Sequence, residues 1–139
     1  MKITEVRTTG LPEAGEDPER PGEPDLTVQA NTLVEILTDE GLSGIGSCFT
    51  SQPFVDASLT VLEPLIVGET MFEAERVSET LRQNAFWHGR GGAVEHTISG
   101  LDIALWDLMG KALGQPVSRL LGGNYRERIK AYASILFDD

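Results

Sequence analysis

Two histidines are the side chains in this sequence best suited by type to hold a metal ion or to move a proton. His88 and His96 lie eight residues apart in the segment HGRGGAVEH. No metal-site pattern has this spacing, and no acid or cysteine completes a ligand set around it. We therefore expect a capping, surface or interface role for each histidine.

Two groups of glycines have the composition of nucleotide-binding loops without their spacing. In the first group, Val94 stands where a dinucleotide-binding loop needs its third glycine. The second group lacks the Lys and the Ser or Thr of a phosphate-binding loop. We interpret both groups as turns. They are Gly89, Gly91 and Gly92, and Gly41, Gly44 and Gly46.

Three further side chains do not combine into a catalytic set. Cys48 has no histidine near it in the sequence, so we expect a small buried side chain rather than a nucleophile. Asp102 and Asp107 are five residues apart on a predicted helix, and their directions differ by about 140°. They cannot act as a carboxylate pair. We expect Asp102 to be a buried acid with a polar partner.

Composition excludes several classes of partner. The 139 residues carry 11 Lys and Arg against 22 Asp and Glu, which gives a net charge of −11. Binding to nucleic acids or anionic membranes requires clustered Lys and Arg side chains, and this acidic sequence has no run of basic residues. We therefore expect neither as a partner. A single cysteine cannot close an intrachain disulfide, and residues 1–10 lack the apolar stretch of a signal peptide or membrane span. These features favour the cytoplasm.

Strand patterns lie on both sides of a long acidic segment. Residues 2–9, 26–38 and 43–49 have the composition and alternation of strands. A turn at 39–41 joins the last two, which predicts an antiparallel three-stranded meander. The segment at 12–25, PEAGEDPERPGEPD, holds four prolines, six acids and one base, so we expect a loop there. The predicted buried face of the second strand is Val28, Ala30, Thr32, Val34 and Ile36.

Helical periodicity follows the strands and predicts three helices. The first begins at Pro53, and the second is capped by Thr70 with Glu73 reaching back. The third runs over 93–113 and is stopped by Gly114, before one short turn. The predicted buried faces are Phe54, Ala57, Val61, Leu62 and Leu65; then Ala74, Val77 and Leu81; then Val94, Ile98, Leu101, Leu105, Leu108 and Ala112.

Three strands followed by three helices make a complete two-layer α+β unit. The pattern RIKAYASIL at 128–136 is that of a further strand, for which this unit offers no partner. We therefore expect the sequence to be the amino-terminal part of a longer protein. One domain would occupy residues 1–124, and a linker with a first strand of the next domain would occupy residues 125–139.

The segment TISGLDIALWDLMGKALGQPVSRLLGG at 97–123 resembles the amino-terminal-domain signature of the enolase superfamily, in its mandelate racemase and muconate-lactonizing branch. The strand KITEVRT, the TDEG turn, the strand GIG and the three helices have the same organisation, so the resemblance covers essentially the whole chain. The matching positions are Ser99, Asp102, Ala104, Trp106, Asp107, Gly110, Lys111, Gly114, Pro116, Leu120, Leu121, Gly122 and Gly123.

This resemblance implies that the unit caps a modified (β/α)8 barrel whose first strand would be RIKAYAS. Such enzymes abstract the proton α to a carboxylate with a Lys or His base, and Mg²⁺ stabilises the enediolate. The bases and metal ligands lie on later barrel strands, which this sequence does not contain. We expect no catalytic residue, no metal ligand and no activity in these 139 residues alone.

The resemblance also implies that two loops of the capping domain close over a small carboxylic-acid substrate. By position they are residues 12–25 and residues 48–53. Phe49 would form an apolar lid, and two hydroxyls beside it suit a polyhydroxy acid. The alternative is that these residues only cap the next helix. The expected substrate-capping residues are Glu16, Arg20, Phe49, Thr50 and Ser51.

Within the branch, FWHGRGG and the run ISGLDIALWDLMGKALGQPV look most like members that dehydrate or epimerise sugar acids. We therefore expect the specificity domain of a Mg²⁺-dependent sugar-acid dehydratase, joined to its own carboxy-terminal barrel and forming a homo-oligomer. One alternative is a racemase, epimerase or cycloisomerase of the same superfamily. The other is a noncatalytic stand-alone interaction domain.

Overall fold

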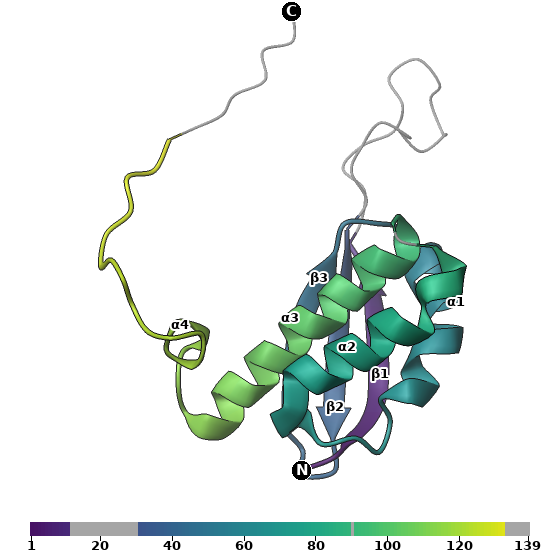
Figure 1. Cartoon of the computed structure of the whole chain (residues 1–139), viewed down its shortest axis with the longest axis horizontal. Helices are drawn as coiled ribbons and strands as arrows, with labels where there is room; N and C mark the ends of the chain where they lie inside the picture. The colour runs from purple at the N-terminus through teal and green to yellow at the C-terminus, as the bar shows by residue number, and fades with distance from the viewer. Residues whose placement is uncertain (12–30, 90, 133–139) are drawn as a thin grey trace, which may run out of the picture.

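The computed structural model describes residues 1–11, 31–89 and 91–132. The body of the domain has two layers, a three-stranded sheet and a layer of helices that covers one face of it (Figure 1). The predicted α+β class is confirmed. Within the described ranges, no helix has the length and apolar character needed to cross a bilayer.

The sheet is the predicted antiparallel meander, with β2 between β1 and β3. Thr32, Val34 and Ile36 alternate toward the helices and are fully buried, as the strand pattern predicts. Val28 and Ala30, also expected on that face, lie outside the described residues. The strands are β1 (Ile3–Gly10), β2 (Thr32–Thr38) and β3 (Ser43–Cys48).

Helix α3 is the longest element, and both α1 and α2 pack against it (Figure 1). Gly114 ends α3 in the left-handed conformation at φ 60°, as predicted. The helices are α1 (Gln52–Leu62), η1 (Glu63–Leu65), η2 (Met71–Glu73), α2 (Ala74–Asn84), η3 (Phe86–His88), α3 (Ala93–Leu113) and α4 (Val117–Leu120). The stripe of α3 is buried as expected at Ile98, Leu101, Leu105 and Leu108, and half-buried at Val94 and Ala112.

Backbone packs directly on backbone where α3 crosses β3. A Cβ atom on Gly46 would overlap the carbonyl oxygen of Gly100, and one on Gly44 would overlap that of Ala104. A Cβ atom on Gly100 would in turn overlap the sulfur of Cys48. The interpretation of Gly44 and Gly46 as turn residues is wrong, because both lie inside β3 and leave room for the helix.

Helix α1 is rotated relative to the predicted orientation. Phe54 and Val61 were expected in the core but are 63% and 42% exposed, and Ala57 is exposed as well. The rotation follows from Gln52 and Asp56, because both side chains bind the end of β1. The residues that face the core are Val55, Ser58, Leu59 and Leu62, so only Leu62 of the predicted face is buried, with Leu65 half-buried.

The predicted cap before α2 forms in part. Thr70 Oγ1 accepts a hydrogen bond from Phe72 N at 3.4 Å, and Thr70 thereby caps η2, which leads into α2. Glu73 does not reach back, because its carboxylate pairs with Arg76 one turn later. The buried face of α2 contains the expected Ala74, Val77 and Leu81 together with Ser78.

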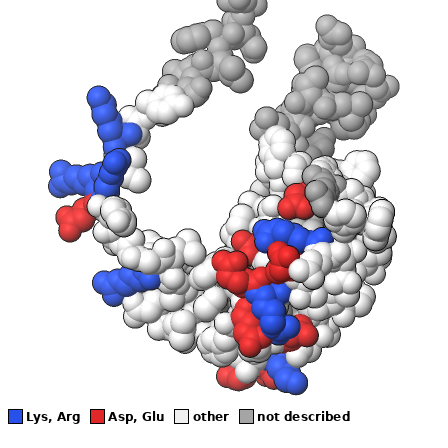
Figure 2. Space-filling model, in the orientation of Figure 1, with Lys and Arg blue, Asp and Glu red and all other residues white. Residues whose placement is uncertain are grey.

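Opposite charges alternate over the outer face of α2 and α3 (Figure 2). Arg76 pairs with both Glu69 and Glu73, and Arg82 Nε lies 3.8 Å from Glu95 Oε1. The two arginines are balanced by acids, so the described part of this face presents no basic patch of the kind that nucleic acids attract.

Asp102 is half-buried on α3 and accepts a hydrogen bond from the hydroxyl of Ser78, which is fully buried on α2. The expected polar partner is confirmed, whereas the acid itself is only half-buried. Because a carboxylate away from water needs such a donor, this pair fixes how α2 and α3 meet.

Asp107 and Lys111 fasten the other side of α3 to β3. Asp107 Oδ2 accepts a hydrogen bond from Ile45 N at 2.8 Å and lies 2.7 Å from Lys111 Nζ. Lys111 Nζ also donates to the carbonyl oxygen of Ser43 at 2.9 Å. Burial opposes ionisation of Asp107, but the hydrogen bonds from Lys111 and Ile45 and the charge of Lys111 outweigh it and lower the pKa of this carboxyl.

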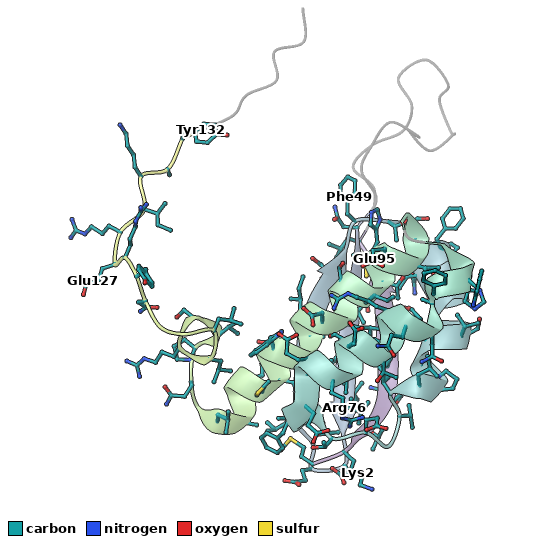
Figure 3. The ribbon with its side chains drawn as sticks, viewed as in Figure 1. Lys2, Phe49, Arg76, Glu95, Glu127 and Tyr132 are labelled. Carbon is teal, nitrogen blue, oxygen red and sulfur yellow. The ribbon has the colours of Figure 1, made fainter. Side chains whose placement is uncertain are left out.

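After α4 the chain forms no helix or strand as far as residue 132, and it leaves the body with its side chains in solvent (Figures 1 and 3). Tyr125, Ile129 and Tyr132 are each more than four-fifths exposed. The strand predicted over 128–136 and the boundary after residue 124 stay predictions, and residues 133–136 lie outside the described residues.

Replacing Gly46 tests the close approach of α3 and β3. Gly46→Ala should lower the free energy of unfolding by about 2–4 kcal/mol, because the added methyl group has no room against the α3 backbone. Gly91→Ala is the matched control, since a Cβ there meets nothing within 4 Å, and it should change stability by less than about 0.5 kcal/mol. Urea titration of both variants measures this. Equal midpoints would contradict the packing described.

The Asp107 carboxylate should stabilise the domain in a pH-dependent way. Its folded pKa lies below the ordinary value of 3.8, so its contribution is present above that pH and is lost as the pH falls through the folded pKa. Asp107→Asn should therefore cost about 0.2–1 kcal/mol at pH 7, a modest value because the pair is partly exposed. Urea titrations toward pH 3 should show the difference from wild type shrinking. A difference independent of pH would refute the ion pair's role.

Candidate functional site

The chain segments that flank the two predicted substrate-capping loops, residues 12–25 and residues 48–53, lie together at one end of the domain. Strand β1 ends there, β2 begins, β3 ends, and α1 and α3 both begin (Figure 1). The amide of Leu11 donates to the carbonyl oxygen of Asn31 at 2.9 Å, which closes the base of the first loop. We call this end the loop edge, made of residues 8–11, 31–32, 48–52 and 92–96.

Phe49 stands at the loop edge directly after β3 and is 52% exposed (Figure 3). Its ring meets the imidazole of His96 edge-on, with ring centres 6.3 Å apart and planes at 69°. His96 lies in the first turn of α3, so this contact joins the loop after β3 to the helix that covers it. An apolar ring held this way can cover a ligand without collapsing onto the sheet.

Thr50 and Ser51 are held by their main-chain atoms and not by their hydroxyls. The carbonyl oxygen of Thr50 accepts from Thr32 Oγ1 at 2.8 Å, and that of Ser51 accepts from the amides of Phe54 and Val55 at 3.1 and 3.2 Å. Ser51 is the N-cap residue of α1, but its side chain makes no capping hydrogen bond. Among the described residues, neither hydroxyl has a hydrogen-bond partner.

Gln52 positions this loop on the sheet. Its Oε1 accepts from the amide of Gly10 at 3.0 Å, and its Nε2 donates to Thr8 Oγ1 at 3.0 Å. The start of α1 is thereby fixed to the end of β1, next to the first predicted loop. No local sequence pattern indicates this role, because the partners are more than 40 residues apart.

His96 is a second residue of the loop edge that the sequence did not assign to it. Its Nδ1 is buried, and it has no hydrogen-bond partner among the residues that the structure describes. The expectation of a capping, surface or interface role for this histidine did not include the contact with Phe49, since the two residues are distant in sequence.

Cys48 is 1% exposed beneath α3, as expected for a small buried side chain. Burial raises the pKa of its thiol to about 11, against a smaller lowering by the backbone of Gly100. A thiol with this pKa is not a nucleophile at neutral pH. Among the described residues, no three His, Cys, Asp or Glu side chains lie close enough to hold a metal ion.

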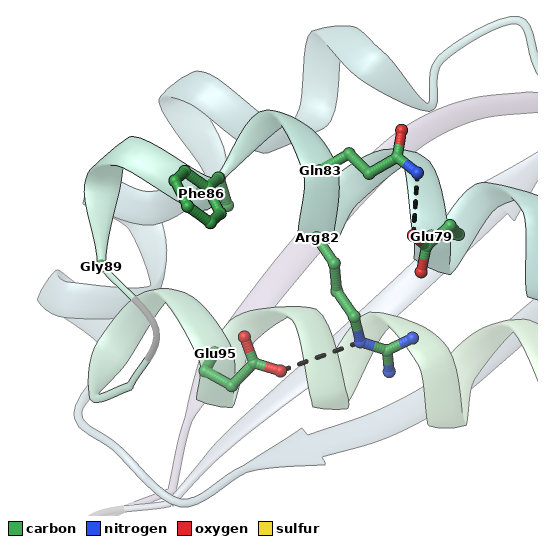
Figure 4. A pocket seen from close by; sticks show the side chains of 7 residues that line it. Glu79, Arg82, Gln83, Phe86, Gly89 and Glu95 are labelled. Atoms are coloured by element: carbon green, nitrogen blue, oxygen red, sulfur yellow. Dashed lines mark hydrogen bonds and ion pairs between the residues drawn. The ribbon is translucent and has the colours of Figure 1, made fainter.

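A hollow of about 430 Å³ lies where α2 ends and α3 begins (Figure 4). Its polar side chains bind one another: Gln83 Nε2 donates to Glu79 Oε1 at 2.8 Å, and Arg82 faces Glu95. The carboxylates of Glu79 and Glu95 outnumber the guanidinium of Arg82, so the hollow carries a net negative charge, which disfavours an anionic ligand. We therefore place the candidate site at the loop edge and not in this hollow.

The structure brings Phe49, Thr50 and Ser51 together at the loop edge. Glu16 and Arg20, the other expected substrate-capping residues, lie outside the described residues.

The sequence matches the mandelate racemase / muconate lactonizing enzyme, N-terminal domain, family over residues 22–122. The chain belongs to this family. Its fold agrees, since the solved 3,6-anhydro-D-galactonate cycloisomerase of Zobellia galactanivorans superposes with a TM-score of 0.75 at 25% identity, over 88% of this chain and 32% of that one. The predicted capping domain of the enolase superfamily is thereby confirmed.

Two curated relatives illustrate the similarity. The D-galactarolactone cycloisomerase of Agrobacterium fabrum is 34% identical over 134 residues, which cover 96% of this chain and 35% of that protein. The D-galactonate dehydratase of Verminephrobacter eiseniae is 40% identical over 103 residues, which cover 72% of this chain and 26% of that protein. The chain thus spans about a quarter to a third of the length of these relatives.

Proposed function

We propose that residues 1–124 are the capping and specificity domain of a Mg²⁺-dependent enzyme that abstracts the proton α to the carboxylate of a sugar acid, with dehydration as the reaction. The observation that carries the proposal is the loop edge, where an exposed phenyl ring stands beside two hydroxyls without hydrogen-bond partners among the described residues. Such a surface can exclude water and recognise the distal hydroxyls of a polyhydroxy acid.

The chain's own contribution is binding and closure. Phe49 would exclude water from the reacting carbon, and Thr50 and Ser51 would hydrogen-bond hydroxyls remote from it. Glu16 and Arg20, outside the described residues, complete the proposed substrate-capping set. The described residues of the loop edge include no Lys or Arg, so they offer the substrate's carboxylate no cationic partner.

The magnesium ion that the family implies does not fit the described residues, which contain no candidate ligand group. We therefore assign no chemical step through the metal to this chain. Proton abstraction belongs to a barrel domain following residue 124, and the 139 residues alone would be inactive.

Dehydration of a sugar acid is supported by relatives that carry the name D-galactonate dehydratase. A second candidate reaction is cycloisomerisation, because one relative matched over 96% of this chain carries the name D-galactarolactone cycloisomerase. Both acids have hydroxyls distal to the carboxylate, so the proposed role of the loop edge is the same in each case. A cytoplasmic homo-oligomer that binds no nucleic acid or membrane completes the proposal.

Grafting tests the substrate class. Residues 1–124 would replace the corresponding domain of the Agrobacterium fabrum cycloisomerase, and the fusion with magnesium would be assayed against aldonic and aldaric acids. Thr50→Ala with Ser51→Ala should lower kcat/KM for the best acid by about ten- to hundredfold, because its hydroxyls lose their partners. Magnesium affinity should not change.

Thr4→Ala with Ser118→Ala is the matched control, since it removes the same two hydroxyl types from exposed positions outside the loop edge. It should leave kcat/KM unchanged. Turnover confined to apolar, N-acylated or dipeptide acids would reject the sugar-acid assignment. Proton exchange of any carboxylic acid by the 139 residues alone, above the buffer rate, would reject the claim that the chain is inactive by itself.

A further inference from the structure

Three side chains at and beside the loop edge form one continuous chain of hydrogen bonds. Thr8 Oγ1 donates to Asp56 Oδ1 at 2.5 Å and accepts from Gln52 Nε2 at 3.0 Å. Gln52 Oε1 in turn accepts from the amide of Gly10 at 3.0 Å. We call the side chains of Asp56, Thr8 and Gln52 the loop-edge relay. It joins the end of β1 to the first two turns of α1.

Local structure brings the members of the relay together. Gln52 and Asp56 are four residues apart on α1, so they share one face of the helix. Thr8 is half-buried near the end of β1 and meets that face. A Cβ atom on Gly10 would stand 2.8 Å from Gln52 Oε1, so the absence of a side chain at Gly10 lets the Gln52 amide approach the strand.

The hydrogen bonds of the relay have a fixed direction. A carboxylate only accepts hydrogen bonds, so the hydrogen of the Thr8 hydroxyl is committed to Asp56. The oxygen of that hydroxyl must then accept, which turns Gln52 Nε2 toward Thr8 and leaves Gln52 Oε1 for the amide of Gly10. Gln52 Nε2 also lies 3.4 Å from the carbonyl oxygen of Thr8, which is a second acceptor. Through Thr8, Asp56 therefore supports the orientation of the Gln52 amide.

The relay is one of two anchors on either side of the hydroxyls of the candidate site. Before them, the carbonyl oxygen of Thr50 accepts a hydrogen bond from Thr32 Oγ1 at 2.8 Å, and Thr32 is fully buried. After them, Gln52 directly follows Ser51 and ties the start of α1 to β1. Among the described residues, the hydroxyls of Thr50 and Ser51 have no partner of their own. Their positions therefore depend on the main chain that the two anchors hold.

We propose that the loop-edge relay determines substrate specificity, with Asp56 and Thr8 as positioning residues that act through Gln52 on the hydroxyls of Thr50 and Ser51. The preference for acids with distal hydroxyls would depend on the relay, whose members need not bind the substrate themselves. This inference rests on the proposed function. A misplacement of about 1 Å is enough to lose much of the benefit of an oriented contact. A hydrogen bond to a carboxylate is also stronger than a neutral one, which suits Asp56 to hold the relay in place.

Hydrogen exchange of the full 139-residue chain, followed by NMR, tests whether the relay exists. Asp56→Ala should speed exchange of the Gly10 amide by about fivefold, although three successive hydrogen bonds separate the two residues, because Thr8 no longer orients Gln52. Asp56→Asn keeps an oxygen acceptor and should restore most of the protection. Glu75→Ala is the matched control, since it removes an exposed acid from the first turn of α2, and it should leave exchange of the Gly10 amide unchanged.

Kinetics of the fusion with the Agrobacterium fabrum barrel test the specificity role. The kcat/KM for a sugar acid would be compared with that for the same acid without its distal hydroxyls. Thr8→Val, which keeps the shape of the side chain, should lower the first about tenfold, mainly by raising KM, and change the second less than about twofold. Gln52→Glu replaces the donor by a second acceptor and should have the same effect.

Two further variants separate the relay from a general effect on folding. Thr8→Ser keeps the hydroxyl and should restore the preference for the hydroxylated acid. Thr60→Val is the matched control, since the hydroxyl of Thr60 binds the carbonyl oxygen of Ala57 within α1, and it should leave both kcat/KM values unchanged. The urea midpoint of each variant shows how far stability contributes.

Three results would overturn the proposal. The first is an equal loss with both acids in Thr8→Val, in step with a lower urea midpoint, because the relay would then only support the fold. The second is wild-type kinetics in Thr8→Val, and the third is a wild-type exchange rate of the Gly10 amide in Asp56→Ala. If the wild-type fusion turned over no sugar acid, the proposed function would fail and the specificity role with it, whereas the exchange rates would still decide whether the relay exists.

Discussion

The rest of the domain depends on the contact between the backbones of α3 and β3. No side chain separates the two elements where Gly44 and Gly46 of the strand face Gly100 of the helix. The backbone of α3 therefore packs in direct contact with the sheet. This fixes the height and direction of the helix, against which α1 and α2 then pack. It also sets the first turn of α3 beside the end of β3, where Phe49 meets His96. Polar contacts stabilise the same arrangement. Asp107 and Lys111 bind α3 to β3, and the hydrogen bond from Ser78 to Asp102 joins α2 to α3.

The loop edge follows from this rigid frame. Each of its segments is an end of a packed strand or helix. Hydrogen bonds of the main chain and of the Gln52 and Thr32 side chains hold these segments, and among the described residues the hydroxyls of Thr50 and Ser51 have no partner. The described residues supply an apolar lid and hydrogen-bonding groups but no metal ligand cluster, and their single cysteine is held protonated by burial. These properties agree with the proposed role, in which this domain selects and encloses a substrate and another domain supplies the reacting groups.

Local signals predicted most of the fold. The bounds of α3 follow from its apolar spacing and from Gly114, and the meander follows from alternation in Thr32, Val34 and Ile36. The rotation of α1 could not be predicted, because two overlapping sets of apolar residues fit the helical period and the choice depends on the bonds of Gln52 to a distant strand. For the same reason the roles of Gln52 and His96 were missed, and the assignment of residues 12–25 and 48–53 as substrate-capping loops stays a prediction from the resemblance. Contacts between residues more than 40 positions apart have no local pattern.

Hydrogen exchange measured by mass spectrometry tests most directly which end of the domain meets the substrate. The fusion of residues 1–124 to the barrel of the Agrobacterium fabrum relative would be compared with and without a bound sugar acid, in the presence of magnesium. We predict that the acid slows exchange in peptides covering residues 8–11, 31–32 and 48–53 and leaves exchange at the opposite end of the domain unchanged. Slower exchange at the 38–43 turn or at 66–71, with no change at the loop edge, would contradict it.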